Sequence, residues 1–210
     1  MKFHLAGLTQ KQIEVMRQAG PALRERGFYL AGGTALAVYY GHRRSVDLDW
    51  FLPGPLADAL VLANWIRASG LPFVTTQTAP GALNGTIRGV RVTFLEYRYP
   101  LLQPLVNWRQ AGISLAGLDD LACMKLSAIA QRGLRKDFCD IYFLGTKHRP
   151  LQDLLGLYQR KFKVRDISPV LYGLSYFDDA EQEPMPRLLQ RVQWKTIKKT
   201  IQGWVRELGK

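Results

Sequence analysis

The spacing of apolar residues divides the chain into two parts of different character. In the first part, short apolar runs bounded by Gly and Pro alternate with stretches of helical spacing, whereas after Pro104 the apolar positions recur every three or four residues. The first part is predicted to hold helices over 9–26, 35–40 and 56–69, and strands over 28–31, 46–51, 73–78 and 85–99. The second is predicted to hold helices over 118–131, 134–144, 151–161 and 187–208. Gly20-Pro21 is expected to break or kink the first helix.

This order of elements predicts an α/β (α+β) fold, with a small mixed sheet covered by helices and followed by a helical C-terminal half. The change of pattern places the expected boundary near residue 113, which gives a core over 1–112 and a helical domain over 113–210.

Composition narrows the choice of function classes. The content of 47% hydrophobic and 22% charged residues is ordinary for a globular protein. The longest nearly uncharged stretch, 28–40, is shorter than the roughly 18 residues of a membrane span, and no apolar leader is visible, so a cytoplasmic protein is expected. Cys123 and Cys139 are too few for a disulfide framework or a thiolate metal site. A net charge of +12 favours polyanionic partners, namely RNA, DNA or nucleotide phosphates.

The pair Asp47 and Asp49 carries the strongest chemical signal. On a strand, residues two apart point to the same side, so both carboxylates face one space while Leu48 faces the core. Two such carboxylates repel each other unless a cation neutralises them, and Mg²⁺ or Mn²⁺ takes oxygen ligands of this kind together with substrate phosphates. An isolated Asp-x-Asp is more often a solvated strand end.

The residues that precede Asp47 and Asp49 favour a binding site over a solvated strand end. Gly32 and Gly33 follow a buried strand and open a helix, whose first N–H groups can meet a phosphate. Thr34 is expected to cap that helix or to contact a phosphate oxygen. Arg44 and Ser45 stand just before the carboxylates, where they can contact phosphates or solvent.

A third acidic residue is a candidate to join the pair. In the run 89–97 (GVRVTFLEY), alternation places Glu96 on one face with Val92 and Phe94. Glu96 is therefore considered as a further metal ligand, against the alternative of a strand-end glutamate in solvent.

A helical segment later in the chain supplies a cation and more carboxylates. Lys125 falls on an apolar stripe, which is costly for an ammonium group unless an anion accompanies it or the side chain reaches water. Asp137 and Asp140, three residues apart, are expected to be neighbours on the next helix. Their alternative reading is surface salt bridging with Arg135 or Lys136.

These motifs together resemble those of the AbiEii/AbiGii toxin family, which belongs to the polymerase-β-like nucleotidyltransferase superfamily. The run AGGTALAVYYGHRRSVDLDWF is similar to the family's first block, and residues 125–144, with Lys125, Arg132 and KDFCDIYFL, are similar to its second. The resemblance implies a polymerase-β-like core, in which Lys125 and an aspartate belong to the active site. That role is carried over to Asp140, and with less weight to Asp137; Lys136 is counted with the nucleotide-binding groups. Asp140 is expected to orient Lys125 or to act as a base.

The resemblance also implies a reaction. A metal-dependent enzyme would move an NMP group from an NTP to an acceptor hydroxyl, as the toxin of a toxin–antitoxin or phage-defence pair, with tRNA or another RNA as acceptor and an antitoxin as partner. The alternatives are a non-catalytic nucleotide- or RNA-binding module, an AMPylation-like transferase acting on protein, and transfer of the γ-phosphate.

Overall fold

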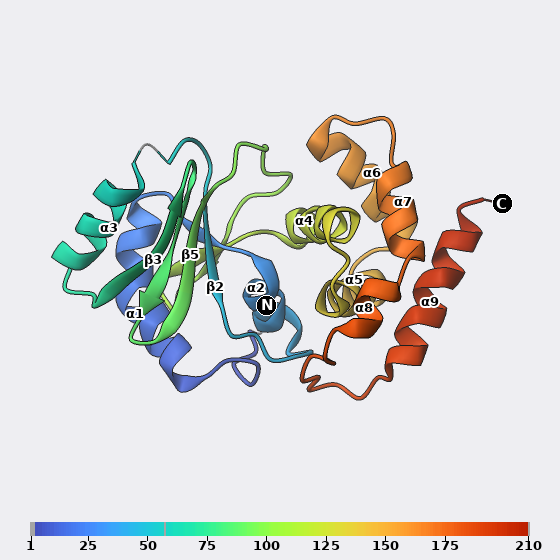
Figure 1. Cartoon of the computed structure of the whole chain (residues 1–210), viewed down its shortest axis with the longest axis horizontal. Helices are drawn as coiled ribbons and strands as arrows, with labels where there is room; N and C mark the ends of the chain where they lie inside the picture. Colours follow the sequence, from blue (N-terminus) through green and yellow to red (C-terminus); the bar gives the residue numbers. More distant parts are fainter. Residues whose placement is uncertain (1–2, 57, 210) are drawn as a thin grey trace.

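A computed structural model describes residues 3–56 and 58–209. Its described elements come in the following order: α1 (Gln10–Glu25), β1 (Tyr29–Leu30), α2 (Gly32–Tyr40), β2 (Leu48–Leu52), α3 (Ala59–Ala68), β3 (Phe73–Ala79), β4 (Ala82–Ile87), β5 (Val90–Glu96), β6 (Val106–Trp108), β7 (Ile113–Leu115), α4 (Leu118–Gln131), α5 (Arg135–Lys147), α6 (Leu151–Phe162), α7 (Ser168–Ser175), α8 (Asp178–Gln182) and α9 (Trp194–Glu207). Figure 1 shows the sheet with α1 and α3 in one half of the molecule and α4 to α9 in the other, with α2 between them.

The strands of the described chain form one mixed sheet in the order β3-β4-β5-β2-β1-β7-β6. Strand β2 lies in the middle, antiparallel to β1 and parallel to β5, and β1 pairs in parallel with β7. Side chains of β2 alternate as the pattern predicts, with Leu48 and Trp50 fully buried and Asp49 only partly so. The mixed sheet and the covering helices confirm the α/β (α+β) fold class.

Helix α1 shows how local sequence fixes one of the covering elements. It begins with a capping box, in which Thr9 Oγ1 accepts from the Gln12 N–H and the Gln12 side chain accepts from the Thr9 N–H. The helix runs unbroken through Pro21, so the expected break is wrong. Gly20 is needed for packing, because a Cβ atom there would lie 2.2 Å from Ile113 on β7.

The helical half is organised around α4, which packs against α5, α6 and α7. Helix α2 contacts both α4 and α5, so that it joins the sheet to the helical half. Buried apolar side chains of the two halves form one continuous cluster, which includes Trp50 and Phe94 from the sheet and Phe138 from α5. No helix of the described chain combines the length and the apolar character that crossing a membrane requires.

The structure corrects several predicted boundaries. The strand expected over 85–99 is two antiparallel strands, β4 and β5, which turn at Arg88 and Gly89 with positive φ angles. Ile113–Leu115 is a strand that pairs with Leu30, so the helical half begins at Leu118 and not near 113. Helix α4 occupies the predicted residues 118–131, whereas α9 begins only at Trp194 instead of at 187. The short elements β6, β7, α7 and α8 were not predicted.

Candidate active site

A cavity of about 490 Å³ opens between the sheet and the helical half. It is bounded by the start of α2, the loop before β2, helix α4, the beginning of α5 and the segment before α9. The charged and glycine residues that line it are Gly32, Gly33, Arg43, Arg44, Asp47, Asp49, Lys125, Arg132, Lys136 and Arg187. Most of the predicted site residues thus line one cavity, although they come from segments far apart in the sequence. The exceptions are Thr34, Glu96, Asp137 and Asp140.

Asp47 and Asp49 both line this cavity, from the end of the loop and the start of β2. Asp47 Oδ1 lies 2.6 Å from Nε of Arg91, in an ion pair at the surface. Burial and the neighbouring Asp47 carboxylate raise the pKa of Asp49, and Lys125, Lys136 and Arg132 only partly oppose this. The site therefore holds acidic groups that a further cation would stabilise.

Gly32 allows the start of α2 to approach Asp49 closely. Its φ angle of 65° lies in the left-handed region, and a Cβ atom there would stand 2.6 Å from Asp49 Oδ2. A Cβ atom at Gly33 would lie 2.3 Å from the Arg43 guanidinium. The N–H groups of the first turn of a helix have no partner within the helix, so this turn presents donors to the same space as the carboxylates.

Thr34 and Ser45 have structural contacts that the sequence did not foretell. Ala31, not Thr34, occupies the N-cap position of α2, and Thr34 lies fully buried within the helix. The Thr34 hydroxyl donates to the main-chain carbonyl of Asp47 and lies 2.8 Å from Ser45 Oγ. The expectation that Thr34 caps the helix or binds phosphate is therefore wrong: it fastens the loop that carries Asp47. Ser45, like Arg44, does line the cavity.

Lys125 reaches the cavity from α4, held by two carboxylates. Its Nζ lies 2.8 Å from Asp137 Oδ1 and 2.7 Å from Asp140 Oδ2. Burial alone would lower the pKa of Lys125, but Asp140 and Asp137 outweigh it and raise that pKa, so the side chain stays an ammonium ion. This explains how a lysine can occupy an apolar stripe.

Asp140 is enclosed by cations and by a histidine. The Arg43 guanidinium binds both of its oxygens in a fork, at 2.7 and 2.8 Å, and His42 Nε2 lies 2.7 Å from Oδ1. Burial would raise its pKa, but Arg43 and Lys125 hold the pKa of Asp140 well below its usual range. The Asp140 carboxylate is fully buried, both of its oxygens are bonded to Arg43, and it is absent from the cavity lining. Of the two expected roles, these contacts favour orientation of Lys125 and Arg43 over that of a base.

Asp137 is likewise buried and occupied. Both of its oxygens accept hydrogen bonds from the Arg132 guanidinium, and Oδ1 also accepts one from Lys125 Nζ. Its pKa, which burial would raise, is held low by Lys125 and Arg132. Surface pairing of Asp137 and Asp140 with Arg135 or Lys136 is thus not found, since Arg135 pairs with Glu181 and Lys136 lines the cavity.

Glu96 does not join the two aspartates, so its assignment as a metal ligand is corrected. In the parallel register of β2 and β5, Glu96 stands opposite Leu52, whereas Thr93 stands opposite Asp49. The Glu96 carboxylate accepts the Leu56 N–H at 2.9 Å and pairs with Arg98. Three residues along a strand span roughly 10 Å, which places the carboxylate beyond a shared ion.

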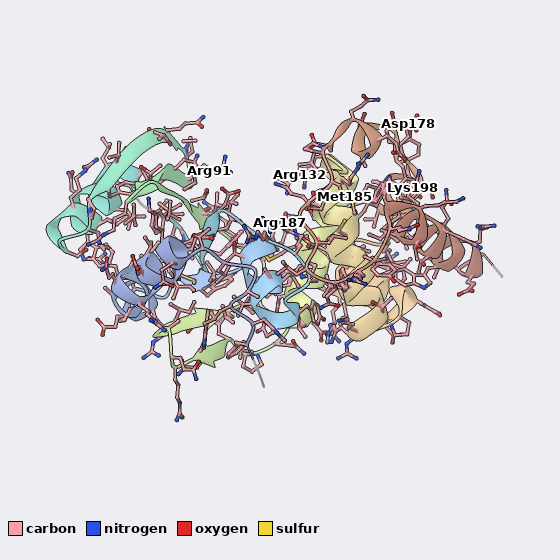
Figure 2. The ribbon with its side chains drawn as sticks, turned by 90° about the horizontal axis from the view of Figure 1, so that it is seen from below. Arg91, Arg132, Asp178, Met185, Arg187 and Lys198 are labelled. Atoms are coloured by element: carbon pink, nitrogen blue, oxygen red, sulfur yellow. The ribbon has the colours of Figure 1, made fainter. Side chains whose placement is uncertain are left out.

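Four arginines at the site were not assigned from the sequence. Arg187 lines the cavity because its segment pairs with the loop before β2. Its main-chain carbonyl accepts the Arg44 N–H at 2.9 Å, and Leu188 forms an isolated antiparallel bridge with Arg43. Figure 2 shows Arg91 on the sheet half and Arg132 on the helical half, with Arg187 between them. For Arg43 and Arg132 the family-like motifs were a usable signal. For Arg91 and Arg187 there was none, because only the sheet register and the returning chain bring them in.

The donor set fits a divalent ion that shares its ligands with a substrate. Within residues 3–56 and 58–209, no three His, Cys, Asp or Glu side chains gather as a complete metal site. Asp47 and Asp49 supply hard oxygen donors, and the raised pKa of Asp49 marks a place where a cation is favoured. Mg²⁺ commonly binds through one or two carboxylates and completes its shell with phosphate oxygens and water. The residues present therefore fit Mg²⁺ or Mn²⁺ bound together with a triphosphate.

Comparison with known proteins decides the family. A family model described as the nucleotidyl transferase AbiEii toxin of type IV toxin–antitoxin systems matches residues 15–205. The chain belongs to the AbiEii family. It is therefore a nucleotidyltransferase, and the resemblance seen in its motifs is confirmed. An uncharacterized protein of Aquifex aeolicus (strain VF5) is 42% identical over 159 residues, which are 74% of this chain and 76% of that protein.

Solved structures support the AbiEii assignment at the level of the fold. A candidate nucleotidyltransferase from H. pylori superimposes with a TM-score of 0.57 at 16% identity, covering 96% of each chain. MenT4, a nucleotidyltransferase toxin of Mycobacterium tuberculosis H37Rv, gives a TM-score of 0.56 at 14% identity, over 93% of this chain and 82% of that one. At these identities the likeness shows a shared nucleotidyltransferase fold.

Proposed function

We propose that this AbiEii-family protein transfers an NMP group from an NTP to the hydroxyl of an RNA acceptor, tRNA in particular, with Mg²⁺ or Mn²⁺ held by Asp47 and Asp49. One observation carries the proposal: the carboxylate pair, the glycine turn that opens α2 and the buried Lys125 all line one cavity. The net charge of +12 and the arginines around the cavity favour a polyanionic acceptor over a protein.

The residues divide the work of holding the substrate. The first N–H groups of α2, at Gly32 and Gly33, and the ammonium of Lys125 bind the triphosphate, with Arg44, Lys136 and Arg187 adding positive charge. Ser45 stands where its hydroxyl can contact a phosphate oxygen. When bound to Asp47 and Asp49, the metal ion supplies neutralisation of the phosphate charge and polarisation of the attacking hydroxyl.

The transfer exchanges one phosphorus–oxygen bond for another. The acceptor oxygen bonds to the α-phosphorus, the bond between that phosphorus and the oxygen bridging to the β-phosphate breaks, and pyrophosphate leaves with the electron pair. The hydroxyl proton passes to Asp47, Asp49 or water, because the described lining contains no histidine and no other carboxylate. Lys125 and the arginines hold the charge that develops on the pyrophosphate.

The test uses the full chain with Mg²⁺, total tRNA and each NTP labelled at the α- or the γ-phosphate. Label from the α-position is expected on RNA, and none from the γ-position. Asp49→Asn is expected to abolish labelling, whereas Asp153→Asn, a matched change on the exposed face of α6, keeps it. Label on protein would indicate an AMPylation-like enzyme, and label from the γ-position would indicate phosphoryl transfer. Nucleotide binding without any Asp49-dependent transfer would leave a non-catalytic module.

The family description also bears on the biological role. Because the AbiEii family comprises toxins of type IV toxin–antitoxin systems, we propose that this chain has a cognate antitoxin and acts in growth control or phage defence in the cytoplasm. Expression of the chain alone should slow growth in proportion to its transferase activity. Equal growth arrest by the wild type and by Asp49→Asn would contradict a role through nucleotidyl transfer.

A further inference from the structure

A second cavity of about 460 Å³ adjoins the first. The two share Phe51, Met124, Ala128 and Arg132 in their linings. Five of the eleven residues that line the second cavity are aromatic, and these are Phe51, Tyr97, Tyr99, Tyr158 and Phe162. The proposed phosphate transfer uses none of these rings, so the aromatic pocket needs its own explanation.

The rings come from the two halves of the molecule, with Tyr99 edge to face against Phe162 and Tyr158 tilted against it. Tyr97 and Tyr99 follow β5, whereas Tyr158 and Phe162 stand one turn apart on α6. The Tyr99 and Tyr158 ring centroids each lie 4.7 Å from that of Phe162. Tyr99 nevertheless remains 49% exposed. A cluster that leaves a ring half uncovered beside an active-site cavity offers a surface for a flat ligand.

A buried ion pair fixes the segment that carries the two tyrosines. Lys161 and Asp120 are both fully buried, with 2.6 Å between Nζ and Oδ1. Lys161 also donates to the Pro100 carbonyl at 2.7 Å, and Asp120 accepts the N–H groups of Leu102 and Gln103. These bonds tie the chain after Tyr99 to α4 and α6. The aromatic pocket is therefore preformed, which lowers the entropic cost of binding.

Positive charge borders the aromatic pocket. Arg132 lines both cavities, and Asp137 holds its guanidinium while the side chain stays 52% exposed. Val164 also lines the pocket, and it stands between the exposed Lys163 and Arg165 in the sequence. Aromatic faces combined with cations are the means by which proteins bind single-stranded nucleic acid and unpaired bases.

We propose that this aromatic pocket receives a nucleobase by stacking, next to the triphosphate site. The base belongs either to the NTP or to the end of the acceptor RNA, and in this the proposal rests on the proposed function. In both cases the shared Arg132 lies between the base and the phosphates. The pocket would then set which nucleotide or which RNA end the enzyme accepts.

Binding of probes with and without a base tests this, without any need for turnover. One arm uses a 5′-labelled single-stranded RNA that ends in a base or in an abasic ribose, followed by fluorescence anisotropy. The other compares each NTP with ribose 5′-triphosphate by calorimetry, in the presence of Mg²⁺. The full chain is used as the wild type and as Tyr99→Ala, Tyr158→Ala, Tyr99→Phe and Tyr158→Phe. Tyr172→Ala, at a tyrosine that is 69% exposed on α7, is the matched control.

The alanine variants are expected to bind base-containing probes roughly tenfold more weakly. Base-free probes should be unaffected, the phenylalanine variants should bind as the wild type does, and so should the control. A loss confined to RNA assigns the pocket to the acceptor, and a loss confined to NTP assigns it to the nucleotide. The proposal would be overturned if the alanine variants lost as much affinity for base-free probes as for base-containing ones, or if they lost no affinity at all. Absence of transfer by the wild type would remove the proposed function but not this binding result.

Discussion

Two pairs of aspartates stand on opposite sides of the active-site cavity, and their environments differ sharply. Asp47 and Asp49 lie on the sheet side and line the cavity, and the pKa of Asp49 is raised by burial and by its neighbour. Asp137 and Asp140 lie on the helical side, fully buried, with low pKa values set by Lys125 and by arginines. The cations near Asp49 do not offset the rise in its pKa, whereas the cations around Asp137 and Asp140 outweigh the effect of burial on theirs.

The contrast teaches that acidic residues around one cavity need not share one role. Mutual repulsion of two carboxylates lowers the stability of the folded chain when no ligand is bound, and such a loss of stability is common at binding sites. A pair neutralised by cations in low dielectric is a structural anchor, whose loss leaves charges stranded. We therefore propose that Asp47 and Asp49 contact metal and substrate, whereas Asp137 and Asp140 position Lys125, Arg43 and Arg132.

The largest effect expected is on activity at the sheet-side pair. Asp49→Asn removes one of the proposed metal-binding oxygens, so transfer should fall by roughly 10³-fold or more. The same change should leave stability equal or higher, because it relieves repulsion from Asp47. Radiolabel transfer and urea unfolding measure the two properties. Strong destabilisation would mean that Asp49 is structural and that the comparison is mistaken.

The next largest effect is on stability at the helical-side pair. Asp140→Asn leaves Arg43 and Lys125 buried without their shared counter-charge, which should cost about 3–5 kcal/mol of unfolding free energy. Urea denaturation, with Asp153→Asn as control, measures this. If Asp140→Asn retained wild-type stability while losing all activity, Asp140 would be a catalytic group after all.

A smaller effect is expected where the two halves are brought together at α2. Gly32→Ala introduces a Cβ atom 2.6 Å from Asp49 Oδ2 at a φ angle of 65°, which should cost roughly 1–3 kcal/mol and displace the carboxylate. Transfer should fall more than stability does. Gly156→Ala is a suitable control, because no atom lies within 4 Å of the added Cβ on α6. Equal behaviour of the two variants would show that close approach to Asp49 is unimportant.

The smallest effect is the response to acid. Because the pKa values of Asp137 and Asp140 are lower in the folded chain than when unfolded, their contribution is present above the ordinary aspartate pKa and is lost as pH falls through the folded values. Melting temperatures measured from pH 7 down to about pH 2 should therefore decline once the pH falls below the ordinary aspartate pKa of 3.8, and should decline less steeply in Asp140→Asn. Parallel curves for the two proteins would show that Asp140 is not among the groups responsible.

The sequence by itself determined the family, the class of fold and the placing of Asp47 and Asp49 at one cavity. Each of these depends on local patterns: Asp47 and Asp49 share a side because strand geometry has a period of two, and the spacing of residues 118–131 is sufficient to define α4. Family-like blocks extended this to Lys125 and to the two aspartates of α5. The roles of these residues as catalytic or binding groups stay predictions.

Only the tertiary structure decided which charges meet. The register of β2 and β5 sets Thr93, not Glu96, opposite Asp49, and no local pattern contains that offset. The return of the chain before α9 brings Arg187 to a loop about 140 residues earlier in the sequence. Strand β7 is too short for alternation to reveal it, and its place depends on pairing with Leu30. Long-range pairing and burial, rather than propensity, separate the partly buried carboxylates of Asp47 and Asp49 from the fully buried ones of Asp137 and Asp140.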